Sequence, residues 1–342
     1  MTSARGRLLL IDVGGTIGEG SPRYPRPSWR IEHCGAARLL SPARTRALRR
    51  IADFDYVFAS DAGSPDIDPR VWLEVAKAIY QHKTDYAGFV VTHGTDTLAW
   101  AAATLGFALW GLSAPVVVTG ATRPLTSPGS DGWPNLVGSF HAAHRGVGPG
   151  VAVAFGSRIL HGCRARKLAS SGPVDVFESP AIPPLGRTGN IRLVPRRIHL
   201  ESQPLQLDES RRFHFDPAVA FVPISPNLPE TAFARLRWSR GVVVETYPSG
   251  TIPRRILPVL KALAADRPVV VSVENGRLVA PDWPRYPSFL IPARDMTREA
   301  VVVKLMWALA QSADRDSLRQ LMTTNLVGEL SPSEPAADAH RR

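Results

Sequence analysis

The segment FVVTHGTDTL, residues 89–98, joins two different sequence patterns. The apolar run at 89–92 indicates a strand buried on both faces, and the apolar spacing over 97–109 indicates a helix. Between the two stand imidazole, hydroxyl and carboxylate side chains. A buried strand that leads directly into a helix is typical of a parallel sheet with helices on both sides. In such a sheet, ligands bind outside the carboxyl ends of the strands, so this junction is a candidate site.

The same alternation of strand and helix repeats along the chain. Strands are expected at 8–13, 56–59, 89–92, 116–119, 151–155, 241–245 and 269–273. Helices are expected at 44–51, 69–79, 97–109, 134–143, 253–264 and 297–310. The sequence therefore predicts an α/β protein with two domains. The larger, N-terminal domain has a parallel-type sheet flanked by helices, and the smaller C-terminal domain is also α/β.

The domain boundary is expected where the composition of the sequence changes. Residues 180–229 are rich in Pro and Arg, and the β-α alternation restarts at 241. We place the N-terminal domain at 1–216, a linker at about 202–229 and the C-terminal domain at 217–330. The tail at 331–342 is rich in Pro, Ala, Asp and Arg, and we expect it to be disordered.

The charge balance raises the question of nucleic-acid binding. The chain has 342 residues and a formal net charge of +11, and 36 of its 41 basic residues are Arg. Ten of these Arg lie in the first 50 residues, beside only three acids. The excess is Arg-only and N-terminal, and it is not interleaved with aromatic residues in a known RNA or DNA motif. A nucleic-acid-binding module is therefore the weaker alternative, and no nucleic-acid partner is expected.

The composition also indicates which cellular compartment and which cofactors to expect. At 44% apolar and 21% charged residues, the chain is neither disordered nor fibrous. Cys34 and Cys163 are too few for a disulfide framework, and no Cys/His cluster has zinc-ligand spacing. The apolar run at 8–11 stops at Asp12, and no run approaches the ~18 residues of a membrane span. We expect a cytoplasmic protein without a membrane partner, a metal or a cofactor.

Two further features carry candidate chemistry. Residues 8–18 read LLLIDVGGTIG, a strand that ends in a turn whose glycines let backbone N–H groups approach a ligand, followed by the Thr16 hydroxyl. By itself this is also an ordinary turn. In the segment after the strand at 89–92, helix caps explain one or two of the polar residues, but a hydroxyl beside a carboxylate can also activate a nucleophile. Lys167 is one of only five Lys, so it is either a surface residue or a group that exchanges a proton or supplies a compact ammonium.

Together these motifs resemble the bacterial-type L-asparaginase family. The motifs are GGTI near the N-terminus, THGTDTL, TGAxRPxxxxxSDGxxNL and DMTxEAxxxKLMWAL, in that order. The closing LMTTNLVGEL at 321–330 looks like the end of the cytoplasmic, type I branch. The resemblance extends from about residue 8 to 330.

The resemblance implies an amidohydrolase that converts the side-chain amide of L-asparagine to L-aspartate and ammonia through a threonine acyl-enzyme. Thr16 matches the primary nucleophile. Thr95, Asp96 and Lys167 match a second threonine, its carboxylate and the lysine that completes that triad. The family pairs its nucleophile with a tyrosine on the following loop, and Tyr24 is the candidate here.

The resemblance also implies substrate contacts and an oligomer. Gly15, Gly94, Thr95 and Asp96 belong to the substrate-binding motifs, and Ser64 occupies the position of the substrate-binding serine. Asp96 would bind the ammonium of a free amino acid, and Ser64 its carboxylate. The family needs no cofactor. Its C-terminal domain completes the site of a neighbouring subunit, which implies a homodimer or homotetramer.

Several departures from the family pattern leave the substrate open. Val13 stands where a threonine is usual, Gly63 and Pro65 interrupt the motif around Ser64, and Thr251 replaces a common asparagine. The alternatives are the same chemistry on glutamine, on a D-amino-acid amide or on an amide of a specialised pathway. A catalytically dead binding protein is disfavoured because all four core catalytic positions are filled.

Overall fold

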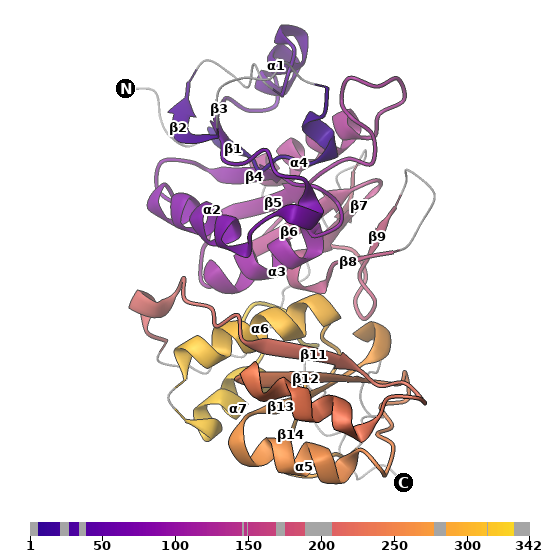
Figure 1. The fold of residues 1–342 in the computed structure, drawn as a ribbon. Helices are drawn as coiled ribbons and strands as arrows, with labels where there is room; N and C mark the ends of the chain where they lie inside the picture. The colour runs from indigo at the N-terminus through magenta and orange to yellow at the C-terminus, as the bar shows by residue number, and fades with distance from the viewer. Residues whose placement is uncertain are drawn as a thin grey trace, which may run out of the picture. The chain divides into compact units, whose positions relative to one another are not determined.

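The chain divides into two compact units, and each has its own sheet (Figure 1). One unit comprises Met1–Ser179 and Pro183–Arg197, and the other comprises Pro180–Ile182 and Ile198–Arg342. The computed structural model describes residues 6–20, 27–33, 39–145, 147–148, 150–168, 175–188, 207–276, 285–312 and 314–331.

In the described part of the first unit, eight strands form one mixed sheet in the order β10-β7-β6-β5-β4-β1-β3-β2. The strands are β1 (Leu8–Asp12), β2 (Ser28–Glu32), β3 (Phe54–Phe58), β4 (Gly88–Thr92), β5 (Pro115–Thr119), β6 (Gly150–Phe155), β7 (Arg158–His161) and β10 (Gly186–Arg187). The five from β6 to β3 are parallel, whereas β2, β7 and β10 pair antiparallel at the edges. Every residue of β1, β3, β4 and β5 is buried, as expected for strands covered on both faces.

Helices cover both faces of this sheet. Figure 1 shows α2 (Pro69–Gln81) and α3 (Leu98–Ala108) in front of the strands. On the other face, α1 (Pro42–Arg49) and α4 (Gly132–Arg145) share a core with alternate residues of β1, including Leu8 and Leu10. α2 begins where the Asp68 carboxylate caps its first turn and Pro69 fixes the first helical residue. The helices thus leave the carboxyl ends of the strands to the loops.

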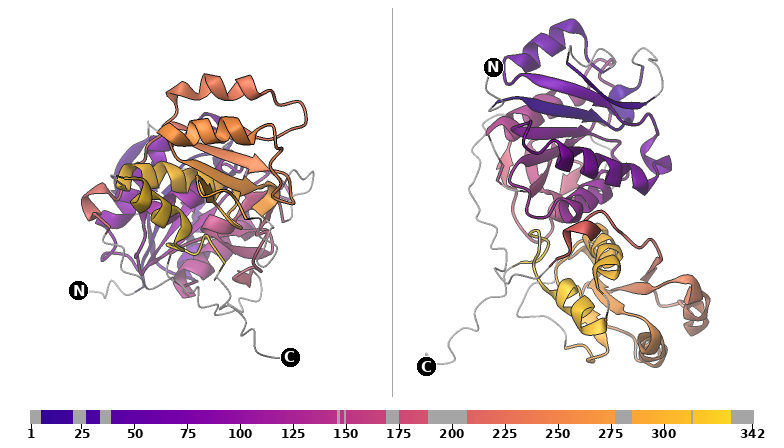
Figure 2. Two further views of the ribbon diagram at one scale, coloured as in Figure 1. Left: turned by 90° about the horizontal axis from the view of Figure 1, so that it is seen from below. Right: turned by 90° about the vertical axis from the view of Figure 1, so that its left-hand side faces the viewer.

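The second unit is a smaller α/β domain. In its described residues, β11 (Val219–Pro223), β12 (Gly241–Thr246), β13 (Val269–Val273) and β14 (Leu290–Pro292) form a parallel sheet in chain order. The left panel of Figure 2 shows this sheet between two pairs of helices. One pair is α5 (Leu257–Asp266) with the 3₁₀ segment Glu230–Trp238, and the other is α6 (Arg298–Gln311) with α7 (Arg315–Thr323).

This architecture confirms the predicted fold class of two α/β domains. The strands and helices expected from the sequence are present, with ends that differ by a few residues. The sequence reasoning missed the short edge strands, a two-stranded ladder of β8 (Arg166–Lys167) and β9 (Phe177–Glu178), and α7. β11 lies within the stretch that we expected to be a linker. Apart from Ser331, the expected disordered tail lies outside the described residues.

A buried ion pair fixes the end of the second unit. The Lys304 ammonium on α6 lies 2.5 Å from the Glu329 carboxylate, and neither side chain is exposed. Lys304 also donates to the carbonyls of Met322 and Thr324, while Glu329 accepts the amide of Val327. Burial alone would raise the pKa of Glu329, but the charge of Lys304 and these hydrogen bonds outweigh it and lower the pKa.

We expect Glu329→Gln to lower the free energy of unfolding at neutral pH by about 3–5 kcal/mol, because it leaves a buried ammonium without its counter-charge. The lowered pKa also makes the stability depend on pH. The stabilisation of the folded state by Glu329 is complete at pH values above the usual carboxyl range, and it is lost as the pH falls through the folded-state pKa. Urea unfolding at several pH values tests both statements. Lys261→Gln, at an exposed position of α5, should change the stability by less than about 0.5 kcal/mol.

Candidate active site

Three chain segments meet at the carboxyl ends of β1 and β4. Gly14 and Gly15, just after β1, both have positive φ, at 87° and 84°. A Cβ on Gly15 would lie 2.3 Å from the Cα of Gly94, and a Cβ on Gly94 would lie 2.3 Å from the Cβ of Ser64. Only glycine permits these approaches. The contacts bring the turn before Thr16, the residues after β4 and the Ser64 turn together.

Lys167 joins Thr95 and Asp96. Its Nζ atom lies 2.8 Å from the Thr95 hydroxyl oxygen and 2.6 Å from a carboxylate oxygen of Asp96. Lys167 reaches this position from β8, 72 residues from Thr95 along the chain. In the single chain the Asp96 side chain is 58% exposed and that of Lys167 is 32% exposed. The cluster is therefore open to a ligand.

Ser64 is oriented by two hydrogen bonds from the same loop. Its hydroxyl oxygen accepts the Asp96 amide at 3.0 Å, and its carbonyl accepts the Thr97 hydroxyl at 2.8 Å. Because the Ser64 oxygen acts as the acceptor here, its own hydroxyl proton remains available for another acceptor. Thr97 occupies the N-cap position of α3, but its hydroxyl makes no capping hydrogen bond and fastens its loop to the turn of Ser64.

Asp12 supports the turn that carries Thr16. This carboxylate is 1% exposed and accepts hydrogen bonds from the Gly14 amide at 3.1 Å, the Thr92 hydroxyl at 2.9 Å and the Tyr56 hydroxyl at 2.8 Å. These donors come from the two neighbouring strands β3 and β4 and from the loop after β1. The sequence analysis did not include Asp12 among the site residues. The signal for it was an acid at the end of an apolar strand.

His93 has a structural position inside the same loop. Its Nε2 atom accepts the indole N–H of Trp72 at 2.9 Å, so its Nδ1–H donates to the Gly94 carbonyl at 2.8 Å. Burial lowers the pKa of His93 to about 4, so the ring is neutral at physiological pH. His93 therefore fixes the backbone of Gly94 rather than supplying a charge.

The TGATRP and SDG segments adjoin this site, where a Cβ on Gly120 would lie 2.2 Å from the His93 carbonyl oxygen. The Asp131 carboxylate accepts the amides of Thr122 and Arg123, and the Asn135 side chain donates to the Gly120 carbonyl. These hydrogen bonds hold the loop after β5. They account for the conspicuous polar residues of this motif as supports for the loop backbone.

Three other residues that the sequence analysis named differ in where they lie. Tyr24 lies outside the described residues. Val13 is buried, and its amide bonds to the carbonyl of Thr92 in β4. Thr251 lies in the second unit, where its hydroxyl is 2.9 Å from that of Ser249.

The Thr16 hydroxyl has a partner that the sequence reasoning missed. It donates to the Glu19 carboxylate at 3.2 Å. Both residues lie in or next to a 3₁₀ turn, Thr16–Gly18. Residues three apart eclipse one another in such a turn, so the order T-I-G-E was the available signal.

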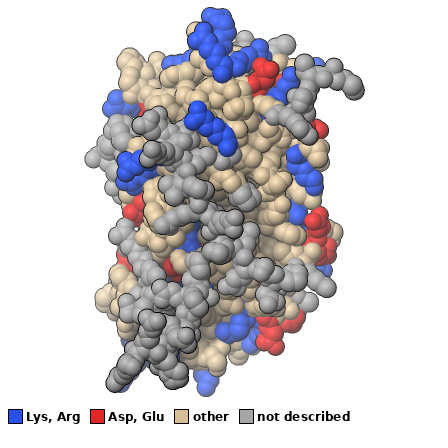
Figure 3. Space-filling view, turned by 180° about the vertical axis from the view of Figure 1, so that it is seen from behind, with Lys and Arg blue, Asp and Glu red and all other residues tan. Residues whose placement is uncertain are grey.

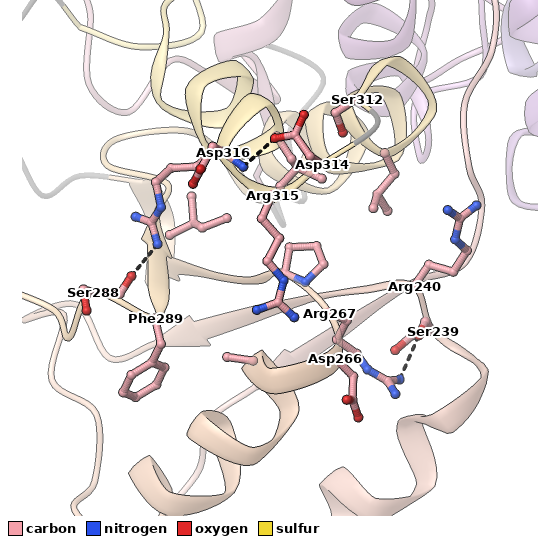
Figure 4. A pocket seen from close by; sticks show the side chains of 16 residues that line it. Ser239, Arg240, Asp266, Arg267, Ser288, Phe289, Ser312, Asp314, Arg315 and Asp316 are labelled. Carbon is pink, nitrogen blue, oxygen red and sulfur yellow. Dashed lines mark hydrogen bonds between the residues drawn. The ribbon is translucent and has the colours of Figure 1, made fainter.

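A cavity of about 560 Å³ lies elsewhere, within the second unit (Figure 4). Its wall contains Arg267, whose guanidinium donates to the carbonyls of Leu236 and Ser239, and Arg315, which donates to the Ala265 carbonyl. These guanidinium groups therefore support backbone turns. Within the described residues, no group of three or more His, Cys, Asp or Glu side chains could hold a metal ion.

The fold and the clustered groups define the class of the protein as a two-domain α/β protein with hydroxyl and carboxylate groups at the carboxyl ends of its strands, where ligands bind in such sheets. Residues 7–199 match the family described as Asparaginase, N-terminal, and residues 218–322 match the Glutaminase/Asparaginase C-terminal domain. The chain belongs to the asparaginase family, and it is a hydrolase that acts on amides.

Three relatives illustrate the similarity. The chain is 35% identical over 280 residues to an L-asparaginase of Thermococcus kodakarensis, covering 78% of this chain and 83% of that protein. It is 32% identical over 285 residues to L-asparaginase 1 of Escherichia coli K12, covering 79% and 82%. The thermostable T. kodakarensis enzyme's solved structure aligns at a TM-score of 0.77 with 31% identity, over 96% of this chain and all of that one. The probable cytoplasmic L-asparaginase of Campylobacter jejuni aligns at 0.74 with 25% identity, over 93% and 99%.

The close backbone approach gives a test. We expect Gly94→Ala to abolish activity and to lower the free energy of unfolding, because its Cβ would overlap that of Ser64. Gly63→Ala is the matched control, since its φ is −61° and the nearest atom to its Cβ would be 3.8 Å away. Thermal unfolding and a turnover assay on both variants measure the difference. Equal stability of the two would contradict the packing described here.

Proposed function

We propose that the protein hydrolyses the side-chain amide of L-asparagine to L-aspartate and ammonia through a threonine acyl-enzyme. The observation that carries this proposal is the cluster of Lys167, Thr95 and Asp96, which adjoins the Thr16 turn through the contact of Gly15 with Gly94. Amide hydrolysis needs a nucleophile, groups that move protons, and donors for the developing oxyanion. This part of the sheet supplies each kind of group.

In the proposed reaction, Thr16 attacks the amide carbon. Gly15 and Gly94 let backbone amides approach the developing oxyanion, where one donor contributes about 2.7–4 kcal/mol to the transition state. Thr95, Asp96 and Lys167 form the second set of groups, in which the lysine holds the threonine hydroxyl and the carboxylate together.

The proposed substrate is a free amino acid. The Asp96 side chain is exposed and can accept an ammonium group. The Ser64 hydroxyl oxygen accepts the Asp96 amide, so its proton is available to a substrate carboxylate. The N–H group that fixes Ser64 belongs to the residue that would bind the ammonium. The two ends of the amino acid would therefore be held by one rigid unit. Glutamine and D-amino-acid amides carry the same two groups, so they are the competing substrates.

Nucleic acid is a weaker candidate partner. On the face seen in Figure 3, the described Lys and Arg side chains lie in separate small groups with acids between them. A nucleic-acid footprint is usually a continuous basic stripe. The many Arg residues of the N-terminal region include Arg49, which covers the ring of Phe54, and Arg44, which lies over Trp133.

We also propose that the protein is a cytoplasmic homodimer or homotetramer. The open Asp96 and Lys167 side chains support an oligomer, because a desolvated site would need further covering surface. Among the described helices, none has the length and apolar character that a membrane span needs. Sedimentation analysis would measure the oligomeric state.

Ammonia release from L-asparagine, L-glutamine and their D-forms tests the proposed function. We expect the highest kcat/KM with L-asparagine, and a drop in kcat of about 10⁴-fold or more in Thr16→Ala and in Thr95→Val, because each removes a group of the reacting set. Ser317→Ala, in the helix α7 of the second unit, is the control and should retain activity. Failure to release ammonia from any of the four amides would refute the proposal, and full activity of Thr16→Ala would refute the assignment of the nucleophile.

A further inference from the structure

We infer that Glu19 is the general base for Thr16, an inference that rests on the proposed function. The Thr16 hydroxyl donates to a carboxylate oxygen of Glu19 across 3.2 Å. That separation lies within the range of about 2.6–3.2 Å over which a general base takes a proton from a nucleophile. A threonine hydroxyl is a weak nucleophile unless such a neighbour activates it.

The backbone hydrogen bonds of the 3₁₀ turn hold Thr16 and Glu19 in contact. The amide of Gly18 donates to the Gly15 carbonyl and that of Glu19 donates to the Thr16 carbonyl, both at 3.1 Å, which closes the 3₁₀ turn. In this geometry the side chains of residues 16 and 19 lie one above the other. The N-cap of this turn is Gly15 and no side chain caps it, so the Thr16 hydroxyl is not engaged as a helix cap.

A second segment holds the turn from outside. The Leu125 amide donates to the Ile17 carbonyl at 3.2 Å, and the Thr126 hydroxyl donates to the Glu19 carbonyl at 3.3 Å. The loop that follows β5 therefore orients the residue that carries the base. A base oriented by a third group is the usual arrangement around an activated hydroxyl.

Among the described residues, the lysine near this turn is already engaged. The Lys167 ammonium donates to both Thr95 and Asp96, so it cannot accept a proton in this arrangement. An ionised Glu19 can accept one, and its exposed side chain shares a face with the Thr16 hydroxyl. Within the described residues, no Lys, Arg or His forms an ion pair with Glu19 that would compete for the proton.

The proton balance is complete with Glu19 alone. When the Thr16 oxygen bonds to the amide carbon, the hydroxyl proton moves to Glu19 and the carbonyl electron pair moves to oxygen. When the tetrahedral species collapses, the C–N bond breaks and Glu19 returns that proton to the leaving nitrogen, which departs as ammonia. Water then attacks the acyl-enzyme, giving one proton to Glu19, and Thr16 leaves with that proton as the acid is released.

The first experiment compares the kinetics of Glu19→Gln with those of the wild type. We expect kcat on L-asparagine to fall about 10²–10⁴-fold with KM changed by less than about threefold, because the glutamine keeps the size of the side chain and loses the base. The matched control is Glu74→Gln, an exposed glutamate of α2 that pairs with Lys77. Activity of Glu19→Gln within threefold of the wild type would overturn the inference.

Two measurements separate a base from a structural support. The β-methyl ester of L-aspartate has a leaving group that needs less protonation, so Glu19→Gln should lose less activity on this ester than on the amide. Added formate should restore part of the activity of Glu19→Ala, because it supplies a carboxylate to the vacated space. Equal losses on ester and amide together with no rescue by formate would overturn the inference.

A third measurement does not depend on the substrate. A small sulfonyl fluoride should label Thr16, as seen by intact-protein mass, and Glu19→Gln should slow this labelling while Thr16→Ala prevents it. Labelling that depends on Glu19 without ammonia release would refute the proposed function and support the base. Ammonia release with labelling independent of Glu19 would refute the base alone, and the absence of both labelling and turnover would refute both.

Discussion

The contact of two glycine backbones is the constraint on which the site depends. Gly15 and Gly94 approach so closely that neither could carry a Cβ, and Ser64 packs against the second of them. The parallel pairing of β1 with β4 sets the two turns side by side, and the missing side chains let them touch. Asp12 and His93 then hold the backbone on either side of this contact. The turns that carry the proposed reacting residues Thr16 and Thr95 are thus positioned by main-chain contacts.

The two proposed catalytic pairs are assembled in different ways. Thr16 and Glu19 are three residues apart, so a single 3₁₀ turn is enough to bring them together. Thr95 and Lys167 are 72 residues apart, so their contact requires the sheet and the small ladder of β8 with β9. One pair therefore depends on a local turn held by the loop after β5, and the other on the completed tertiary structure.

The sequence predicted those features that have a long-range apolar pattern or a dense polar motif. The buried strands could be predicted because burial on both faces leaves a continuous apolar run in the sequence. The helices could be predicted from the helical spacing of their apolar residues. The short strands could not: β2 reads SWRIE and is largely exposed, and β8 is only Arg-Lys. Thr16 and Thr95 were singled out because each follows an expected strand, whereas Ser64 was assigned only through the resemblance to the family. The roles of Asp12 and Glu19 depend on strand register and on the formation of one 3₁₀ turn, so an acid at a strand end and the order T-I-G-E point to these residues without specifying their partners.

The hydrogen bonds of Asp12 also order the events of folding. Its donors, Tyr56 and Thr92, are 44 and 80 residues away along the chain, and β1 lies between β3 and β4 in the sheet. A chain that has been synthesised only as far as β3 can cover one edge of β1 but leaves the other edge unpaired. Because contacts so distant in sequence generally form slowly, we infer that the turn that bears Thr16 acquires its final shape only after β4 has docked.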